Sequence, residues 1–175
     1  MDKVIRGKVY KFGDNIDTDV ITPAYTTVYG LSDEQEYENI KIHSFEQFRP
    51  DFYKEVAPGS ILIAGKNFGC GSHREQASII IGLLGFKAVL ADSVARIFQR
   101  NSIAVGFPVF QAPGITDIAE ESDELELDMA NWKVTNLTTG KSMDLEPFSG
   151  TVLDILEQGG IIQLLKHEME LLESK

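Results

Sequence analysis

Residues 60–77 read SILIAGKNFGCGSHREQA, and this stretch decides the fold. The apolar run at 60–64 leads into a loop with two glycines, and a helical pattern opened by Ser72 and Glu75 follows. We therefore predict a strand, a tight loop and a helix N-terminus. Free backbone N–H groups and the positive end of the helix dipole would converge in front of Ser72, and Arg74 in the first helical turn adds a cation. This arrangement predicts an anion-binding site.

Ser72 and Glu75 also have the S-x-x-E spacing of a capping box, in which Ser72 would only cap the helix. Arg74 argues against a purely structural role, because the helix dipole disfavours a positive charge in the first turn. An arginine placed there suggests a carboxylate or phosphate partner, since its planar fork suits paired oxygens.

Residues 60–110 contain two strand–helix–strand units. Short apolar strands that alternate with helices imply a mostly parallel sheet covered by helices, so we assign the fold to the α/β class. Ligands tend to bind at the edge where strands end and helices begin, and residues 69–74 lie at that edge. The predicted strands are 7–12, 61–64, 88–91 and 105–110, and the predicted helices are 75–84, ended by Gly85, and 94–101, capped by Ser93.

The flanking segments predict smaller elements. Residues 22–50 have no sustained period and indicate a long excursion with short helices near 32–37 and 44–48. A β-hairpin region with a glycine-containing turn is expected between residues 125 and 145. Two helices are predicted over 151–158 and 161–173, separated by two glycines, and the apolar stripe of the second is typical of a core-facing helix.

The chain has 175 residues, enough for one domain with a buried core, and we take residues 1–175 as a single domain. Its 16 Lys and Arg against 27 Asp and Glu give a net charge of −11, which argues against binding to nucleic acid or to an anionic membrane surface. A small di-acid is still compatible, because a local arginine can outweigh distant charges that are screened over about 10 Å.

Cys70 is the single cysteine, so the chain alone forms neither an internal disulfide nor a cysteine-based cluster or zinc site. No apolar run approaches the roughly 18 residues of a membrane span, and the N-terminal residues lack the apolar core of a signal peptide. These features predict a cytoplasmic protein. We interpret Cys70 as a small residue packed in a tight loop rather than as a nucleophile.

A second polar cluster, DNIDTD, spans residues 14–19, with Thr22 just beyond it. Asp, Asn and Thr side chains cap their own backbone in turns, so the cluster is typical of turn structure. A calcium loop is the weaker alternative, because the glycine at position six and the glutamate at position twelve of such a loop are missing.

Three segments in sequence order resemble the small subunits of the aconitase-type hydro-lyases, specifically those of 3-isopropylmalate dehydratase and homoaconitase. They are VYKFGDNIDTDVI at 9–21, NFGCGS at 67–72 followed by Arg74 and Glu75, and ARIF at 95–98 followed by Asn101. The similarity covers most of residues 7–110. It implies the swivelling-domain fold of that family, with a mostly parallel central sheet flanked by helices and a small β-hairpin region.

Carried over to this sequence, the resemblance implies that Ser72 is the catalytic base that removes the proton beside a carboxylate, and that Arg74 holds substrate oxygens. The other residues expected to bind substrate are Thr18, Asp19, Thr22, Gly71 and His73. The implied reaction is a dehydration and rehydration that moves a hydroxyl between adjacent carbons of a malate-type acid.

The same resemblance implies that the active site is formed by two different chains. The 4Fe-4S cluster of the family belongs to a separate large subunit, so this chain would bind no metal of its own and would supply half of an active site. The implied function is that of 3-isopropylmalate dehydratase in leucine biosynthesis. Homoaconitase and 2,3-dimethylmalate dehydratase are the alternatives.

The sequence departs from the family pattern at two positions. His73 stands where the family usually has a second serine, and Gln76 stands where it often has histidine. His73 either adds a titratable donor near the substrate or, as the second helical residue, faces the solvent, and we favour the second interpretation.

Substrate choice in the family is attributed to the loop after the Asp-Thr-Asp segment, here residues 23–30. Because this loop lacks an arginine, a third substrate carboxylate has no obvious partner, while its tyrosines and valine can border an apolar substituent. The pattern favours an alkyl-substituted malate over homocitrate or citrate, unless an arginine from elsewhere, such as Arg49, binds the extra carboxylate. The loop residues with this expected role are Ala24, Tyr25, Thr26, Thr27, Val28 and Tyr29.

Two other classes of protein remain open from the sequence. The Gly-Ser-His-Arg loop at 71–74 fits a non-catalytic module that binds a phosphate or carboxylate effector. The apolar C-terminal stripe also fits a structural or assembly protein.

Overall fold

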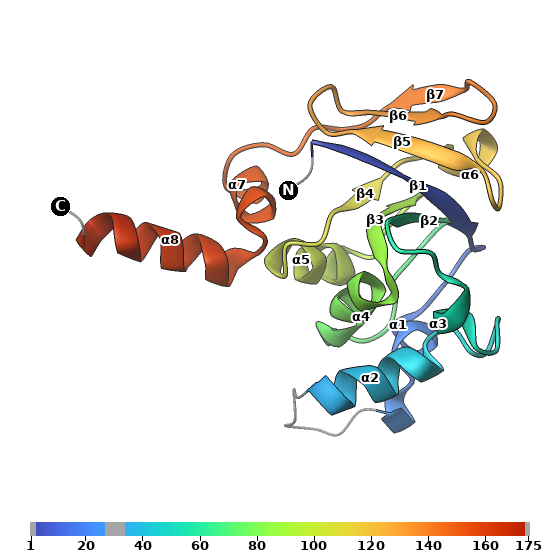
Figure 1. Ribbon diagram of the computed structural model, residues 1–175, viewed down its shortest axis with the longest axis horizontal. Coiled ribbons are helices and arrows are strands. Elements are labelled where there is room, and N and C mark those ends of the chain that lie inside the picture. The colour runs from blue at the N-terminus through green and yellow to red at the C-terminus, as the bar shows by residue number, and fades with distance from the viewer. Residues whose placement is uncertain (1–2, 27–33, 174–175) are drawn as a thin grey trace.

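A mixed sheet lies at the centre of the protein (Figure 1). The computed structural model describes residues 3–26 and 34–173, and within them seven strands form one sheet in the order β4-β3-β2-β1-β5-β6-β7. The strands β4, β3, β2 and β1 pair with one another in parallel. The pairs β1–β5, β5–β6 and β6–β7 are antiparallel. The predicted α/β class, with a parallel central sheet and a β-hairpin region, is confirmed. The strands are β1 (Val4–Lys11), β2 (Ser60–Ala64), β3 (Phe86–Ala91), β4 (Val109–Gln111), β5 (Glu124–Asp128), β6 (Lys133–Asn136) and β7 (Ser142–Asp144).

Helices connect the parallel strands (Figure 1). Helices α4 and α5 cover one face of the sheet, and the short α6 packs on the other face. The helices of the described residues are α1 (Thr18–Ile21), the 3₁₀ helix η1 (Ala24–Thr26), α2 (Glu34–His43), α3 (Phe52–Glu55), α4 (Gln76–Leu84), α5 (Arg96–Ala104), α6 (Ile115–Ile118), α7 (Thr151–Gln158) and α8 (Ile161–Glu173). As predicted, α4 joins β2 to β3 and ends at Gly85, which has a left-handed φ of 112°.

The central strands are buried on both faces because their side chains alternate between two apolar clusters. In β2, Ile61 and Ile63 belong to the cluster shared with β5, β6 and α6, whereas Leu62 and Ala64 belong to the cluster shared with α4 and α5. Strands of this kind are continuously apolar in sequence, which is why residues 60–64 indicated a buried strand.

The helix predicted over 94–101 begins two residues later and continues to Ala104. Ser93 does not cap it, so that prediction is wrong. The Ser93 Oγ instead accepts a hydrogen bond from the backbone N–H of Asn67 at 2.8 Å. Residues 105–108 form a turn and an irregular segment after α5, so the strand predicted over 105–110 is only the three-residue β4.

Residues 44–48 form turns, so the short helix predicted there is wrong. Phe45 has a left-handed φ of 60°, and its backbone N–H donates to the carbonyl of Val20 at 2.8 Å. This conformation places its buried ring 4.6 Å from Phe12 and 5.3 Å from Phe52 between centroids. The packing of the Phe45 ring against Phe12 and Phe52 therefore stabilises the left-handed backbone conformation of this turn. The helix predicted near residues 32–37 corresponds to α2, which is longer than expected, with ten residues.

Helices α7 and α8 are separated by Gly159 and Gly160 as predicted, but the expectation that α8 faces the core is wrong. None of the residues of α8 is buried, and Figure 1 shows the helix extending away from the sheet. Its apolar side chains are exposed instead, for example Met169 at 60% and Leu172 at 71%. The chain changes direction at these two glycines, which have φ values of 79° and 125°. Helix α8 lies close to α5 and α7 without burying any of its residues.

Membrane insertion through a helix has no support in residues 3–26 and 34–173. No helix in this part of the chain has both the length and the apolar character that a membrane crossing requires.

One buried amide anchors the β5–β6–β7 region. The Oδ1 of Asn136 accepts hydrogen bonds from the backbone N–H groups of Thr138 and Thr139, at 2.9 and 3.1 Å. Its Nδ2 donates to the carbonyl of Ile118 at 2.9 Å and to the Oδ2 of Asp123 at 2.7 Å. Asn136 is fully buried, so these partners replace the water that the amide loses on folding.

We expect Asn136→Ala to lower the free energy of unfolding by about 2–3 kcal/mol, because the truncation removes four hydrogen bonds of a fully buried amide at once. Urea denaturation followed by circular dichroism measures the change. Asn131→Ala is the matched control, because Asn131 is exposed, and it should cost less than about 0.5 kcal/mol. Equal losses in the two variants would contradict the anchoring role of Asn136.

Candidate active site at the carboxyl edge of the sheet

The candidate site is built from the loops that follow β1, β2 and β3, at the edge where the sequence predicted a ligand. Backbone pairing continues past the strand ends, with isolated bridges between Asp17 and Cys70 and between Phe68 and Val94. The N–H of Thr18 donates to the carbonyl of Cys70 at 2.8 Å. The two motifs that lie about fifty residues apart in the sequence are therefore held side by side by main-chain hydrogen bonds.

Two glycines make this close approach possible. Gly69 has a φ of 74°, and a Cβ there would lie 2.2 Å from the ring of Phe98 on α5. Gly71 has a φ of 102°, and a Cβ there would lie 3.0 Å from the Thr18 Oγ1. Both the left-handed backbone and the lack of space favour glycine at these positions.

The DNIDTD cluster forms a turn, as predicted, and opens the short helix α1. The Oδ1 of Asp17 caps this helix by accepting hydrogen bonds from the N–H groups of Asp19 and Val20 at 2.8 and 2.9 Å. The Oδ1 of Asp14 accepts the N–H of Lys66 at 2.7 Å, which ties the loop after β1 to the loop after β2. The Asp14 and Asp17 carboxylates are thus engaged by backbone donors.

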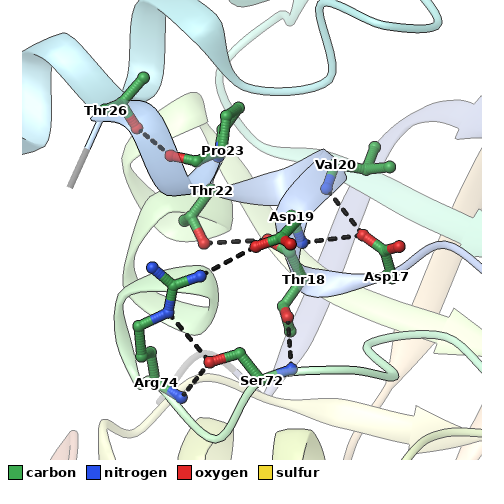
Figure 2. Close-up of polar contacts among 9 residues, drawn as sticks. All are labelled: Asp17, Thr18, Asp19, Val20, Thr22, Pro23, Thr26, Ser72 and Arg74. Carbon is green, nitrogen blue, oxygen red and sulfur yellow. Dashed lines mark hydrogen bonds and ion pairs between the residues drawn. The ribbon is translucent and has the colours of Figure 1, made fainter.

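Ser72, Arg74 and Asp19 form a connected polar chain, and Figure 2 shows the guanidinium of Arg74 between the other two side chains. The Ser72 Oγ accepts hydrogen bonds from the Nε of Arg74 at 2.9 Å and from its backbone N–H at 3.3 Å. The Nη2 of Arg74 lies 2.9 Å from the Oδ1 of Asp19. The Arg74 side chain is 16% exposed and that of Asp19 is 61% exposed. The mostly buried guanidinium of Arg74 is therefore held in hydrogen-bond contact with the Ser72 Oγ.

The expectation that Ser72 opens the helix is wrong, and so is the position of Arg74 in the first helical turn. Helix α4 begins at Gln76, and Glu75 occupies its N-cap without a side-chain hydrogen bond. The backbone N–H of Ser72 donates to the Thr18 Oγ1 at 2.8 Å, so it does not point at a ligand. The donors at the Ser72 oxygen come from Arg74 rather than from the helix dipole.

The hydroxyl groups of Thr18 and Thr22 hold the backbone near Ser72 in place. Their side chains are buried, with 2% and 1% exposure. The Thr18 Oγ1 holds the Ser72 amide, and the Thr22 Oγ1 donates to the carbonyl of Thr18 at 2.9 Å. These hydroxyls position the loop in the structure, and direct contact with a substrate stays a prediction for both.

His73 is exposed, but it is not the second helical residue, because α4 starts three residues later. Its carbonyl accepts a hydrogen bond from the Nδ2 of Asn101 at 2.6 Å, which ties the loop to α5. Gly71 is also exposed. A contact of either residue with a substrate stays a prediction.

The expected specificity loop is described only in part. Ala24 and Tyr25 are exposed, and the ring of Tyr25 lies 5.6 Å from that of His43. Thr26 is buried, and its Oγ1 donates to the carbonyl of Pro23 at 2.6 Å. Thr27, Val28 and Tyr29 lie outside the described residues.

An open cavity of about 540 Å³ borders Ser72 on the side of α5. It is lined by residues 69–72 and 95–97 and by Arg100. From the sequence, Arg96 was noted only within the ARIF motif, and no role was predicted for Arg100. The spacing of these two arginines, one helical turn apart at the predicted edge, was the signal that could have identified them.

Cys70 has a raised pKa. Burial disfavours its thiolate and raises the pKa of the thiol above its ordinary value, and the nearby Asp17 carboxylate acts in the same direction. A thiol of this kind is a poor nucleophile at neutral pH. This property supports the interpretation of Cys70 as a packed residue.

Comparison with known proteins agrees with this geometry. Residues 14–111 match the aconitase C-terminal domain family. The chain belongs to this family. Its resemblance to the aconitase-type small subunits, first seen in three short motifs, is confirmed.

Similar proteins match this chain over almost all of its length. The 3-isopropylmalate dehydratase small subunit of Pyrobaculum calidifontis is 47% identical, over 94% of this chain and 98% of that protein. The methanogen homoaconitase small subunit of Methanothermobacter thermautotrophicus is 42% identical, over 93% of this chain and 91% of that protein. The crystal structure of a 3-isopropylmalate dehydratase chain from Methanocaldococcus jannaschii matches with a TM-score of 0.86 and 36% identity, over 98% of both chains.

We expect Cys70 in the native protein to react with iodoacetamide at pH 8 at least about fivefold more slowly than in the urea-unfolded chain, because its raised pKa leaves less thiolate. The native rate should increase at higher pH than the rate of the unfolded chain does. Mass spectrometry of the alkylated protein measures both profiles. A native rate equal to or above the unfolded rate would show an activated thiol instead.

Proposed function

We propose that this chain is the small subunit of a hydro-lyase that isomerises a malate-type 2-hydroxy acid by dehydration and rehydration, acting as 3-isopropylmalate dehydratase in leucine biosynthesis. The observation that carries the proposal is the Ser72 Oγ, held 2.9 Å from the guanidinium Nε of Arg74 at the edge of the cavity. The names of the similar proteins and their nearly full-length match support the same reaction class.

Ser72 would act as the base that takes a proton from the carbon beside a substrate carboxylate. A serine hydroxyl is too weak an acid to ionise at neutral pH, so its alkoxide needs strong local stabilisation. Arg74 supplies two donors to this oxygen, one from its guanidinium and one from its backbone. As the C–H electrons form the double bond, the hydroxyl leaves the neighbouring carbon, and the reverse steps return it to the other carbon.

Asp19 would orient Arg74 and give way to the substrate. The Arg74–Asp19 ion pair fixes the guanidinium plane, but the Asp19 carboxylate is largely exposed. Because the Asp19 side chain is 61% exposed, it can move into solvent when a substrate carboxylate takes its place on the same guanidinium. Arg74 can then hold substrate oxygens while its Nε stays on Ser72.

The second half of the active site would come from a large subunit. A 4Fe-4S cluster requires several thiolate ligands, and this chain has one cysteine. The residues in the described ranges 3–26 and 34–173 contain no group of three or more His, Cys, Asp or Glu side chains that could hold a metal ion. We therefore assign the cluster, and the handling of the leaving hydroxyl, to the partner.

The decisive experiment is reconstitution with the large subunit of the same organism, assayed against 3-isopropylmalate, 2,3-dimethylmalate, homocitrate and citrate. Activity on 3-isopropylmalate supports the proposal, and activity confined to homocitrate would assign the chain to a homoaconitase. A purified chain that binds carboxylates but gains no activity on mixing would be a non-catalytic anion-binding module.

We expect Ser72→Ala to reduce kcat of the reconstituted enzyme by at least about 10³-fold, because no other group takes the proton. Subunit association and the melting temperature should stay close to wild type. Ser142→Ala, at an exposed serine of β7, is the matched control and should be fully active. A Ser72→Ala enzyme with a near-normal rate would remove Ser72 from the base role.

Arg74→Lys keeps the charge but cannot reach Ser72 and Asp19 with a planar fork. We expect it to raise KM and to lower kcat/KM by about 10²-fold, as measured by steady-state kinetics. Arg6→Lys is the control, because the Arg6–Glu126 ion pair lies on β1 and β5 and Arg6 is 66% exposed. Unchanged kinetics for Arg74→Lys would separate Arg74 from the reaction.

A further inference from the structure

Helix α8 carries the densest group of exposed apolar side chains in the described part of the chain. Thirteen large hydrophobic residues are exposed within 3–26 and 34–173, and six of them lie on this one helix. Monomeric proteins rarely expose contiguous apolar patches larger than a few hundred Å², and larger patches mark interaction sites. The surface of α8 therefore indicates a partner outside the described residues. The six residues are Ile161, Ile162, Leu165, Met169, Leu171 and Leu172.

Four of these residues form a regular line along the helix. Ile162, Leu165, Met169 and Leu172 are spaced by three, four and three residues, which is the a/d pattern of a coiled coil, and we call them the α8 seam. Leu164 is the one residue of α8 that is half-buried. A rotation of about 100° per residue places the seam on a different side of the helix from Leu164. The seam therefore faces away from the domain that carries it.

Helix α8 starts near the end of α5 that lies away from Ser72. The first end of α5 is tied to the Ser72 loop, because the N–H of Ala95 donates to the carbonyl of Phe68 at 2.8 Å. The last end is followed by Gly106, where a Cβ would lie 2.2 Å from the carbonyl carbon of Gly159. The nine residues of α5, about 13 Å of helix, separate these two ends. A partner on the α8 seam therefore leaves the candidate site accessible.

Two kinds of occupant fit the seam poorly. A large subunit that completes the active site must cover the carboxyl edge of the sheet, whereas α8 leaves the domain from its other end. A lipid surface is disfavoured by charge, because α8 contains one lysine and three glutamates and the chain has a net charge of −11. Helices that lie in membrane interfaces are instead rich in lysine and arginine on their polar face.

A second copy of this chain fits the seam. Both copies present the same four apolar positions, so a pair related by twofold symmetry matches one seam to the other. Apolar side chains at a and d positions insert as knobs between the residues of a facing helix. Figure 1 shows α8 projecting away from the sheet, with the C-terminus at its free end, so two such helices can lie along each other while the two sheets stay apart.

We propose that the α8 seam is a self-association surface through which two copies of this chain form a reversible dimer, with both Ser72 loops free to meet a large subunit. This inference goes beyond the proposed function, and dimerisation of the chain does not depend on that function. Complete burial of one large apolar side chain removes about 60–120 Å² from water, so six side chains that are 40–71% exposed supply about 300 Å² on each copy. Stable interfaces bury about 800 Å² per partner, so we expect a Kd in the micromolar range.

Sedimentation velocity of the purified full chain, between about 1 and 200 µM, tests the proposal. We expect the average mass of the wild type to rise toward that of a dimer. Leu165→Glu with Met169→Glu should weaken the dimer at least about 100-fold, because it places charges in the contact. Since α8 has no buried residue, this seam variant should fold and melt within about 2 °C of wild type.

The matched control adds the same two negative charges to the same helix outside the seam. Gln163→Glu with His167→Glu should dimerise like the wild type, which separates burial in the seam from a general effect of net charge. Both variants are also mixed with the large subunit. We expect both to bind it with wild-type affinity and to reach activities within about twofold of wild type, because changes at distant sites act independently.

Each contrary result has a distinct meaning. A wild-type chain that stays monomeric over the whole concentration range would overturn the inference, and so would a dimer that the seam variant retains or that the control loses. Loss of large-subunit binding in the seam variant alone would overturn it and assign the seam to the large subunit. Co-sedimentation of a monomeric wild-type chain with phosphatidylglycerol vesicles would overturn it in favour of a lipid surface.

Discussion

The parallel pairing of β1 with β2 is the constraint on which the site depends. Its register places Val9 beside Ile61, and the pairing continues past both strands to Asp17 and Cys70. The loop that carries Thr18 and the loop that carries Ser72 therefore leave the sheet at the same level. A slip by one residue would exchange the side chains that β2 contributes to the two apolar clusters, and it would also shift the two loops relative to each other. The packing of the core therefore also fixes the geometry of the candidate site.

Within that frame, a side chain rather than a helix end provides the positive field at the serine oxygen. The Ser72 amide is used by Thr18, and α4 starts four residues further along the chain. Arg74 reaches back instead, largely shielded from solvent, where a charge acts more strongly than on the surface. An acidic protein can thus place a guanidinium against one serine oxygen without being basic overall.

The sequence contained enough information for the fold class and the central strands, because continuously apolar segments and glycine-rich loops are local signals. It also indicated the two loops that form the candidate site. It could not separate a helix cap from a tertiary hydrogen bond. Ser72 and Ser93 both have the local pattern of caps. The Ser72 backbone N–H instead donates to Thr18, and the Ser93 Oγ accepts from Asn67, and both of these partners lie far away in the sequence. The amphipathic stripe of α8 was equally ambiguous, since a periodic apolar face looks the same whether or not the fold covers it.

The Ser72 loop is located mainly by backbone atoms, with the amide of Gly69 and the carbonyls of Phe68, Cys70 and His73 all engaged. The side chains at 70 and 73 take no part in these bonds. The hydrogen bonds that place Ser72 therefore do not depend on which side chains stand at positions 70 and 73. A histidine is accommodated at position 73 without loss of any of these bonds, and substitutions at the two positions can change the surroundings of Ser72 while its backbone stays in place.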